Sequence, residues 1–306
     1  MKRVNKILSG ALAGAVLLSL TACGGSASSG TAASSSEAAS SEAASSEAVS
    51  SEAAAGVGAD TQAIIDRGVL RVGVKNAVLG FGYQDPVTGE YSGMEISLAE
   101  KLAEQLGVDV EFTTVTAATR TELLDSGDID CVLATFTITD ERKESWDFTT
   151  PYYTDYVTVL VEDSSGITTL ADLKDKKVGV SSGSTSARAL TEAMIEDGVL
   201  SGDGFDKETF DPSLWTDGVS FQQYDDYPSI STALSAGQID AFCVDKSILA
   251  VYKTEGRSYI DAQFAPQEYG IVTKKDSDVS AYCNDFIEAC LADGTIEGLI
   301  AENNLG

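Results

Sequence analysis

The chain has 306 residues and a formal net charge of −28, with 48 Asp and Glu, 20 Lys and Arg, and no histidine. A surface this acidic repels the phosphate backbone of nucleic acids, which excludes nucleic-acid binding as a function. The absence of histidine removes the commonest general base and the commonest metal ligand, which argues against acid–base catalysis and a histidine metal site.

The first residues have the pattern of a signal peptide. Basic residues precede an apolar run over 7–20, which is short for a membrane span. The run closes with Leu20-Thr21-Ala22-Cys23, which resembles the lipobox of bacterial lipoproteins. The resemblance implies a signal peptide over 1–22, cleavage before Cys23, and a lipid on its sulfur that anchors the protein outside the cell. The alternative is an ordinary signal peptide with an incidental cysteine.

Residues 23–59 consist almost entirely of Ser, Ala, Gly, Glu and Thr. Such a segment has too little apolar surface to offset the entropy of ordering, so we expect a disordered tether.

Beyond the tether, short apolar strands alternate with amphipathic helices, a pattern that predicts an α/β fold. Two segments of the first half return in the second half in the same order. "RVGVKN" (71–76) resembles "KVGVSSGS" (177–184), and "LLDSGDIDCVLAT" (123–135) resembles "ALSAGQIDAFCVD" (233–245). In the second pair a glycine stands where a left-handed residue commonly ends a helix. The repetition predicts two similarly wound lobes.

Polar residues follow equivalent strands in each half. The first half offers Lys75 and the run from Thr135 to Thr137, and the second offers Ser184-Thr185-Ser186 and Asp245. Because ligands of open α/β sheets bind beyond the carboxyl ends of strands, we expect these residues to line one cleft between the lobes.

The cysteines beyond Cys23 suggest neither a disulfide nor a metal site. Cys283 and Cys290 lie seven residues apart in a predicted helix, too far for a bond within it. Cys131 and Cys243 stand in apolar strands, where a buried structural thiol is expected. The Asp-rich turns lack the ligand spacing of a calcium-binding EF-hand loop, so we expect no metal.

Four longer segments resemble the family 3 solute-binding proteins of ATP-binding-cassette importers for polar amino acids. They are "GFGYQDPVTGEYSGMEISLAEKLAEQLG", "ATFTITDERKESWDFTTPYY", "VGVSSGST" and "AGQIDAFCVD". Within that family, "VTAATR", "ATFTIT" and "APQEYG" are most similar to the aspartate and glutamate binders.

The resemblance implies a bilobal, type II periplasmic-binding-protein-like fold of two α/β lobes joined by a two-strand hinge. Lobe 1 would comprise 60–155 and 268–306, and lobe 2 would comprise 156–267. The crossing strands would lie near 154–161 and 268–273. The resemblance implies no cofactor. One departure is the segment 197–220, which is longer and richer in Gly and Asp than expected; its Trp215 would pack on the lobe or reach the cleft rim.

The resemblance also implies which residues would bind the α-carboxylate and the α-ammonium of an amino-acid ligand. Arg142 would grip the α-carboxylate with its planar fork of donors, unless it forms a surface ion pair with Asp140 or Glu141. Asp245 would bind the α-ammonium, unless it caps the helix that follows. Thr135 and Thr137 would add hydroxyl or backbone contacts to the ammonium and carboxylate ends, respectively.

Ser184, Thr185 and Ser186 open a predicted helix, where free N–H groups favour an anion, although plain N-capping would also explain them. Thr139 is expected to cap the helix that contains Arg142.

Lys75 and Arg120 occupy positions that imply a second carboxylate on the ligand. Arg120 stands near a helix start, where a cation opposes the helix dipole and needs another explanation. The alternative for both is ordinary surface charge. Tyr269, in the hinge segment, would hydrogen-bond the ligand or serve as a core tyrosine.

The leading hypothesis is a monomeric, lipid-anchored receptor that captures glutamate or aspartate by lobe closure and delivers it to an ABC permease. Glutamine, cystine or another polar amino acid is the alternative ligand. A dehydratase-type enzyme on the same fold is a second class of function. The lack of histidine and of paired cleft acids argues against it.

Overall fold

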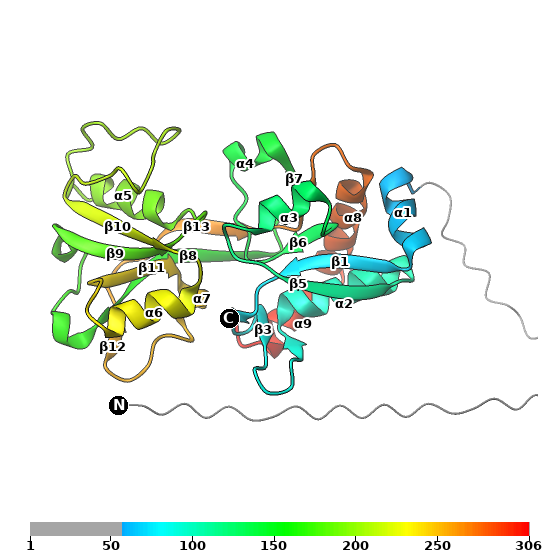
Figure 1. Ribbon diagram of the computed structural model, residues 1–306, viewed down its shortest axis with the longest axis horizontal. Coiled ribbons are helices and arrows are strands. Elements are labelled where there is room, and N and C mark those ends of the chain that lie inside the picture. Colours follow the sequence, from blue (N-terminus) through cyan, green and yellow to red (C-terminus); the bar gives the residue numbers. More distant parts are fainter. Residues whose placement is uncertain (1–56, 306) are drawn as a thin grey trace, which may run out of the picture. The chain divides into compact units, whose positions relative to one another are not determined.

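The computed structural model describes residues 57–305. The predicted signal peptide, the lipidation of Cys23 and nearly all of the predicted tether lie outside the described residues. Within 57–305, no helix is both long and apolar enough to cross a membrane. The described residues form two α/β lobes, each built on its own sheet (Figure 1).

The first lobe contains a five-stranded sheet in the order β5-β1-β6-β14-β7. Strand β1 pairs in parallel with β5 and β6, and β14 runs antiparallel to β6 and β7. The strands are β1 (Val69–Val74), β5 (Asp109–Thr114), β6 (Cys131–Leu133), β7 (Trp146–Phe148) and β14 (Val272–Lys274). The helices are α1 (Ala59–Arg67), α2 (Met94–Leu106), α3 (Arg120–Ser126), α4 (Asp140–Ser145), α8 (Asp278–Ala292) and α9 (Thr295–Glu302).

A small antiparallel sheet, β2-β3-β4, precedes α2. Its strands are β2 (Ala77–Val78), β3 (Gly82–Gln84) and β4 (Tyr91–Ser92). Gly93, between β4 and α2, has φ of 123°, and a Cβ there would stand 2.2 Å from the carbonyl oxygen of Phe81. Only glycine fits this close approach, which sets where α2 begins.

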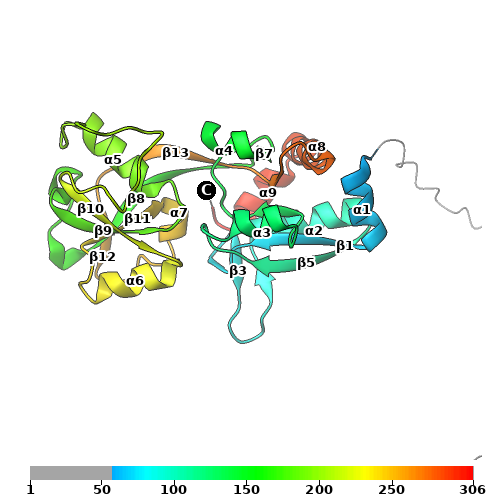
Figure 2. The same ribbon diagram turned by 45° about the horizontal axis from the view of Figure 1, so that its top comes forward.

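The second lobe has the strand order β10-β9-β11-β8-β12, with β13 also paired to β8. Helices α5 and α6 cover opposite faces of this sheet (Figure 1 and Figure 2). The strands are β8 (Tyr153–Glu162), β9 (Lys176–Ser181), β10 (Val219–Tyr224), β11 (Ala241–Asp245), β12 (Arg257–Tyr259) and β13 (Phe264–Tyr269). The helices are α5 (Ser186–Glu196), α6 (Tyr227–Ser235), α7 (Lys246–Leu249) and two short 3₁₀ turns, Asp163–Ser165 and Ala171–Leu173.

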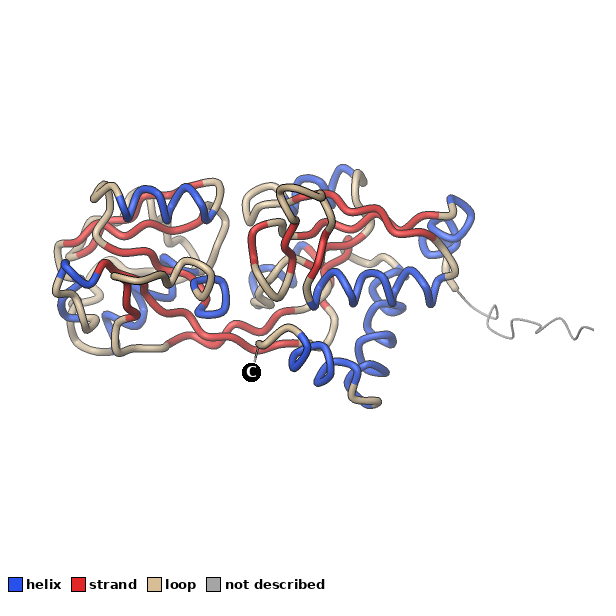
Figure 3. Tube along the Cα trace, turned by 90° about the horizontal axis from the view of Figure 1, so that it is seen from below, coloured by secondary structure: helices blue, strands red, loops and turns tan. Residues whose placement is uncertain are grey.

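The antiparallel strands β8 and β13 run between the lobes (Figure 3). The second crossing strand begins at Phe264, whereas the sequence placed it over 268–273. The apolar residues after Gly270 instead form β14 and belong to the first sheet. A β-bulge between Phe264 and Pro266 shifts the register, and Ala265 there has a positive φ of 46°.

Each sheet carries an apolar core that fixes where its strands end. In the first lobe the core includes Leu70, Val72 and Leu133, and in the second lobe it includes Val159 and Val178. Parallel strands covered on both faces are apolar along their length, so polar side chains are confined to the ends. Gly127 and Gly237 adopt the predicted left-handed conformation after α3 and α6, with φ of 81° and 64°.

The four cysteines of the described residues are free and buried, and the burial of Cys131 and Cys243 agrees with the prediction from their apolar strands. Burial raises the pKa of each thiol.

The segment between α5 and β10 contains no helix or strand and is held by an aromatic cluster. The Trp215 ring packs against Phe205 and Phe210, with centroids 5.9 and 5.7 Å apart. Trp215 therefore packs on the second lobe, whereas Phe210 and Pro212 line the cleft described below.

Candidate functional site

Eight of the ten predicted ligand residues line one small cavity. They follow the carboxyl ends of β6, β9 and β11 or begin the nearby helices, as the position of polar residues after apolar strands predicted. The eight are Arg120, Thr135, Thr137, Arg142, Ser184, Thr185, Ser186 and Asp245. The structure thus brings both halves of the sequence together at one place.

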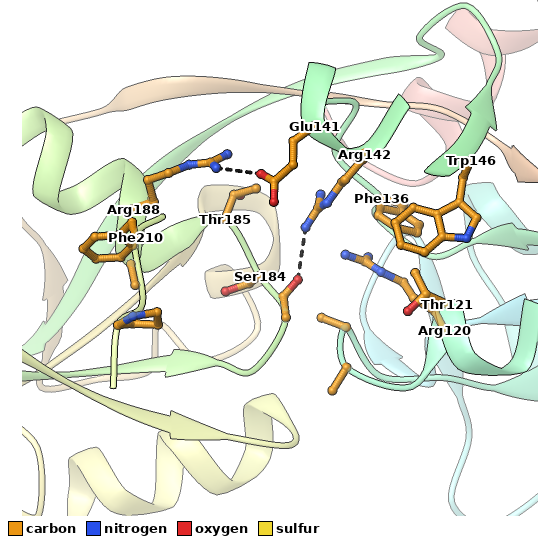
Figure 4. Close-up of a pocket in the computed structure, with 15 residues that line it drawn as sticks. Arg120, Thr121, Phe136, Glu141, Arg142, Trp146, Ser184, Thr185, Arg188 and Phe210 are labelled. Atoms are coloured by element: carbon orange, nitrogen blue, oxygen red, sulfur yellow. Dashed lines mark hydrogen bonds and ion pairs between the residues drawn. The ribbon is translucent and has the colours of Figure 1, made fainter. Parts of the chain in front are cut away.

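Arg142 links the two lobes through its guanidinium. Thr139 caps α4, as predicted, because its side chain accepts a hydrogen bond from the Arg142 backbone N–H at 3.2 Å. The Arg142 side chain donates to the Thr137 carbonyl at 2.8 Å. It also donates to the Gly183 carbonyl of the other lobe at 3.0 Å (Figure 4). It forms no ion pair within residues 57–305, so the predicted alternative of a surface pair is wrong. Glu141 pairs instead with Arg188, at 3.0 Å.

Arg120 is the first residue of α3 and is only 3% exposed. Its guanidinium donates to the Ala134 carbonyl at 3.0 Å and lies 3.5 Å from the centroid of the Phe136 ring. Its Nε is buried without a partner among the described residues. The alternative of surface charge is therefore wrong for Arg120. A buried cation with an unused donor explains why an arginine stands where the helix dipole disfavours it.

Both guanidinium groups remain protonated at neutral pH. Burial lowers the pKa of Arg120 to about 10, and burial together with the charge of Arg120 lowers the pKa of Arg142 to about 9. The site therefore holds two fixed positive charges within the described cavity.

Lys75 is buried but lines an adjoining cavity. Its Nζ lies 5.4 Å from the centroid of the Tyr227 ring, and Tyr227 lines both cavities. Surface charge is wrong for Lys75 as well. Burial, followed by the charge of Arg120, places the pKa of Lys75 well below its usual value.

Asp245 ends β11 and stands at the N-cap position of α7, yet its side chain makes no capping bond. The capping alternative is therefore wrong. Its carboxylate accepts a hydrogen bond from the Tyr269 hydroxyl at 2.5 Å. Tyr269 is fully buried and does not line the cavity, so it supports Asp245 from behind as a core residue. Burial and the nearby charge of Asp155 raise the pKa of Asp245 to about 7.

The serine and threonine hydroxyls at the start of α5 do not cap the helix. Thr185 occupies the N-cap position without a side-chain capping bond, so side-chain capping is wrong for this segment. The hydroxyl oxygens of Ser184 and Ser186 are buried and have no partner in the described part of the chain. They lie where the free N–H groups of an eleven-residue helix favour an anion.

Glu95 belongs to this region, although sequence reasoning did not identify it. Its Oε1 accepts hydrogen bonds from the Thr135 backbone N–H and the Tyr152 hydroxyl, both at 2.6 Å. Thr135 has a positive φ of 46°, which is rare for a threonine. Burial raises the pKa of Glu95. An acidic residue among the apolar positions that open α2 was the available signal.

Gln267 was also missed. It lies in β13, is buried, and accepts hydrogen bonds from Thr137 and Thr185 at 2.7 and 2.8 Å. The "APQEYG" segment resembles a family motif, but nothing in it indicates that Gln267 contacts both lobes.

The cavity opens into a wider cleft, with about 900 Å³ of open space, that Arg120 and Arg142 also line. Figure 4 shows the Arg188–Glu141 ion pair beside this cleft and Trp146 on its lobe 1 side. Phe210, from the long segment of the second lobe, lines the cleft as well.

Two sheets joined by paired crossing strands, with a polar cavity shared by both lobes, define a type II periplasmic-binding-protein fold. Residues 70–303 match the bacterial extracellular solute-binding proteins, family 3, and the chain belongs to this family.

The names of individual relatives state different ligands. The chain is 32% identical over 228 residues to a glutamine-binding protein of Geobacillus stearothermophilus, covering 72% of this chain and 78% of the relative. It is 30% identical over 259 residues to a glutamate-binding protein of Corynebacterium efficiens, covering 79% and 80%. A solved ancestral arginine-binding protein bound to arginine aligns with a TM-score of 0.64 at 31% identity, covering 77% and 98%.

The protein is thus an amino acid ABC transporter substrate-binding protein, of a family whose members are extracellular.

Proposed function

We propose that this protein captures an acidic amino acid, glutamate or aspartate, and delivers it to the permease of an ABC importer. The observation that carries the proposal is the set of cations at the site, of which Lys75 and Arg120 are buried and Arg142 is half-buried. Lys75, Arg120 and Arg142 are each without an ion-pair partner among residues 57–305.

Arg142 and Asp245 form the part of the site that any amino acid would use. Arg142 presents its guanidinium to the α-carboxylate, and the Asp245 carboxylate meets the α-ammonium. The unpartnered hydroxyls of Ser184 and Ser186 add donors on the carboxylate side. Thr135, held by Glu95, and Thr137 line the same cavity.

Arg120 and Lys75 then remain for the side chain of the ligand. A zwitterion brings one positive and one negative charge, which Asp245 and Arg142 match, so Arg120 would still have no ion-pair partner among the described residues. A second carboxylate supplies the missing negative charge, and burial makes such a pair more favourable than at the surface. This balance favours glutamate or aspartate over a neutral amino acid.

Capture proceeds by closure of the lobes about the strands β8 and β13. Arg142 already donates across the cleft to the Gly183 carbonyl, and Arg188 pairs with Glu141 across it. These contacts favour the closed arrangement once a ligand neutralises the cations between them. We further propose that the protein acts as a monomer, is anchored by a lipid on Cys23, and performs no chemistry on its ligand.

A neutral polar ligand such as glutamine is the second candidate, and one observation favours it. Burial and the charge of Arg120 disfavour the charged form of Lys75 and lower its pKa well below the usual value. A weaker positive charge at this position suits an amide group better than a carboxylate. Cystine is a further polar alternative.

A thermal-shift screen of the purified protein against the common amino acids tests the proposal. A thousandfold excess of ligand over its Kd stabilises the folded state by about 4.1 kcal/mol. We expect L-glutamate or L-aspartate to raise the Tm most. The acidic assignment is wrong if L-glutamine or L-cystine raises the Tm and neither acidic amino acid does.

A further inference from the structure

The side-chain amide of Gln267 has a fixed orientation in the hinge. Its Nε2 donates to the Ala265 carbonyl at 2.8 Å. A backbone carbonyl can only accept, so the NH₂ side of the amide must face Ala265 and Oε1 must face the opposite way. The β-bulge at Ala265 presents this carbonyl to the glutamine.

The outward-facing Oε1 of Gln267 contacts one hydroxyl from each lobe. It lies 2.7 Å from Oγ1 of Thr137, in the first lobe, and 2.8 Å from Oγ1 of Thr185, in the second. An amide oxygen has two lone pairs and no proton, so both threonine hydroxyls must act as donors to it.

This arrangement decides what the two threonines can offer a ligand. A hydroxyl has one proton to donate, and Thr137 and Thr185 each use theirs in the hydrogen bond to Gln267. Both residues line the cavity, so a ligand that hydrogen-bonds either hydroxyl can use only its lone pairs. Ser184 and Ser186 differ, because their hydroxyls have no partner within 57–305 and keep their protons free.

We propose that Gln267 is a positioning residue that makes the hydroxyls of Thr137 and Thr185 hydrogen-bond acceptors and so completes, with Asp245, the subsite for the ligand's ammonium group. The cavity then has hydrogen-bond acceptors in these three residues and donors in the arginines and free serines. In this assignment the Thr137 hydroxyl serves the ammonium and leaves the carboxylate to other donors.

The inference rests on the proposed binding of an amino acid, but it does not depend on whether the ligand side chain is acidic. Gln267 stands in a crossing strand and accepts a hydrogen bond from one threonine of each lobe. It can therefore orient the two hydroxyls only when both threonines contact it. Substituting it should therefore alter discrimination for the amino group, which general loosening of the fold would not do.

The test compares each amino acid with its analogue that lacks the amino group. The pairs are L-glutamate with glutarate, and L-glutamine with glutaric acid monoamide. Kd values are measured by calorimetry for the wild type, for Gln267→Leu, and for Gln263→Leu as a control at an exposed glutamine nearby.

We expect Gln267→Leu to weaken binding of the amino acid about tenfold and binding of its analogue less than about threefold, so the preference for the amino group falls. Gln263→Leu should leave both values unchanged. Equal weakening of both ligands, or an unchanged preference, would overturn the proposal.

If Gln267→Leu does not fold, Thr185→Val and Thr185→Ser replace it. The serine variant keeps an acceptor and should keep the preference, whereas the valine variant should lose much of it. Equal preferences in these two variants also refute the role of Gln267. If only the glutamine pair binds, the acidic assignment fails while the test of Gln267 stands. If neither pair binds, both proposals fail.

Discussion

The pH dependence of ligand binding should report the ionisation of Asp245. The groups that face its carboxylate are Tyr269, Asp155, Arg120 and Arg142, and the first two lie on the crossing strands. Burial and the Asp155 charge outweigh the two cations and raise the pKa of Asp245 from 3.8 to about 7. Because the protein has no histidine, few other groups titrate between pH 6 and 8.

The raised pKa of Asp245 determines how the free energy of unfolding changes with pH. The pKa is raised in the folded state, so the folded protein holds the Asp245 proton more tightly than the unfolded chain does. The resulting stabilisation is complete below pH 3.8 and is lost as the pH rises to about 7. The difference corresponds to about 4 kcal/mol. In the ligand-free protein, Asp245→Asn should therefore increase the free energy of unfolding at pH 8 by up to about this amount, and by much less near pH 4.

The affinity for the ligand, in contrast to the folding stability, should rise with pH. An ammonium group requires the ionised carboxylate, and with a pKa near 7 only about a tenth of Asp245 is ionised at pH 6. We expect Kd to be about tenfold higher at pH 6 than at pH 8, with about half a proton released per ligand at pH 7.

Calorimetry at pH 6, 7 and 8, in two buffers of different ionisation enthalpy, measures both quantities. Asp245→Asn should bind more weakly at pH 8 and lose the pH dependence. A wild-type Kd that is constant across this range, with no proton exchange, would refute the assignment of Asp245 to the ammonium.

Three further substitutions test the surroundings of the site. Arg142→Lys replaces the planar fork with a single ammonium and should weaken binding at least tenfold by calorimetry; unchanged affinity would contradict its carboxylate role. Thr139→Ala removes the cap of α4 and should lower the free energy of unfolding by about 1 kcal/mol, while Thr139→Ser should not. In urea denaturation, Gly93→Ala should lower the free energy of unfolding by more than about 2 kcal/mol, because its Cβ meets the Phe81 carbonyl. Gly89→Ala, with open space around it, should lower it by about 1 kcal/mol. Equal losses in the two variants would contradict the close contact at Gly93.

The sequence predicted the parts of the site that depend on local pattern. Apolar strands followed by polar residues indicated where Thr135 and Asp245 would stand, and the Thr-Asp-Glu sequence indicated the cap that positions Arg142. These features depend on a few neighbouring residues, so the order of the chain reveals them.

The sequence did not reveal contacts between distant segments. Glu95 meets Thr135 across 40 positions, and Gln267 meets Thr137 and Thr185 across 130 and 82. The "APQEYG" segment around Gln267 resembles a family motif, but it does not indicate which distant residues Gln267 contacts. Its role depends on how the bulge in β13 turns the amide, and that conformation arises from the tertiary fold.

The predicted second hinge strand shows a related limit. The family resemblance placed this strand near 268–273, but the apolar residues after Gly270 pair with β7 as β14, and β13 crosses instead. Apolar pattern predicts that a strand forms without identifying the sheet it joins.

The most direct test of the acidic assignment is the ratio of Kd values for L-glutamine and L-glutamate, measured by calorimetry for the wild type and for Arg120→Met. Methionine keeps much of the arginine's length and its packing on Phe136 but removes the charge. We predict that the wild type prefers glutamate and that Arg120→Met loses this preference while still binding glutamine. A wild type that prefers glutamine, or a preference for glutamate that survives in Arg120→Met, would contradict the account.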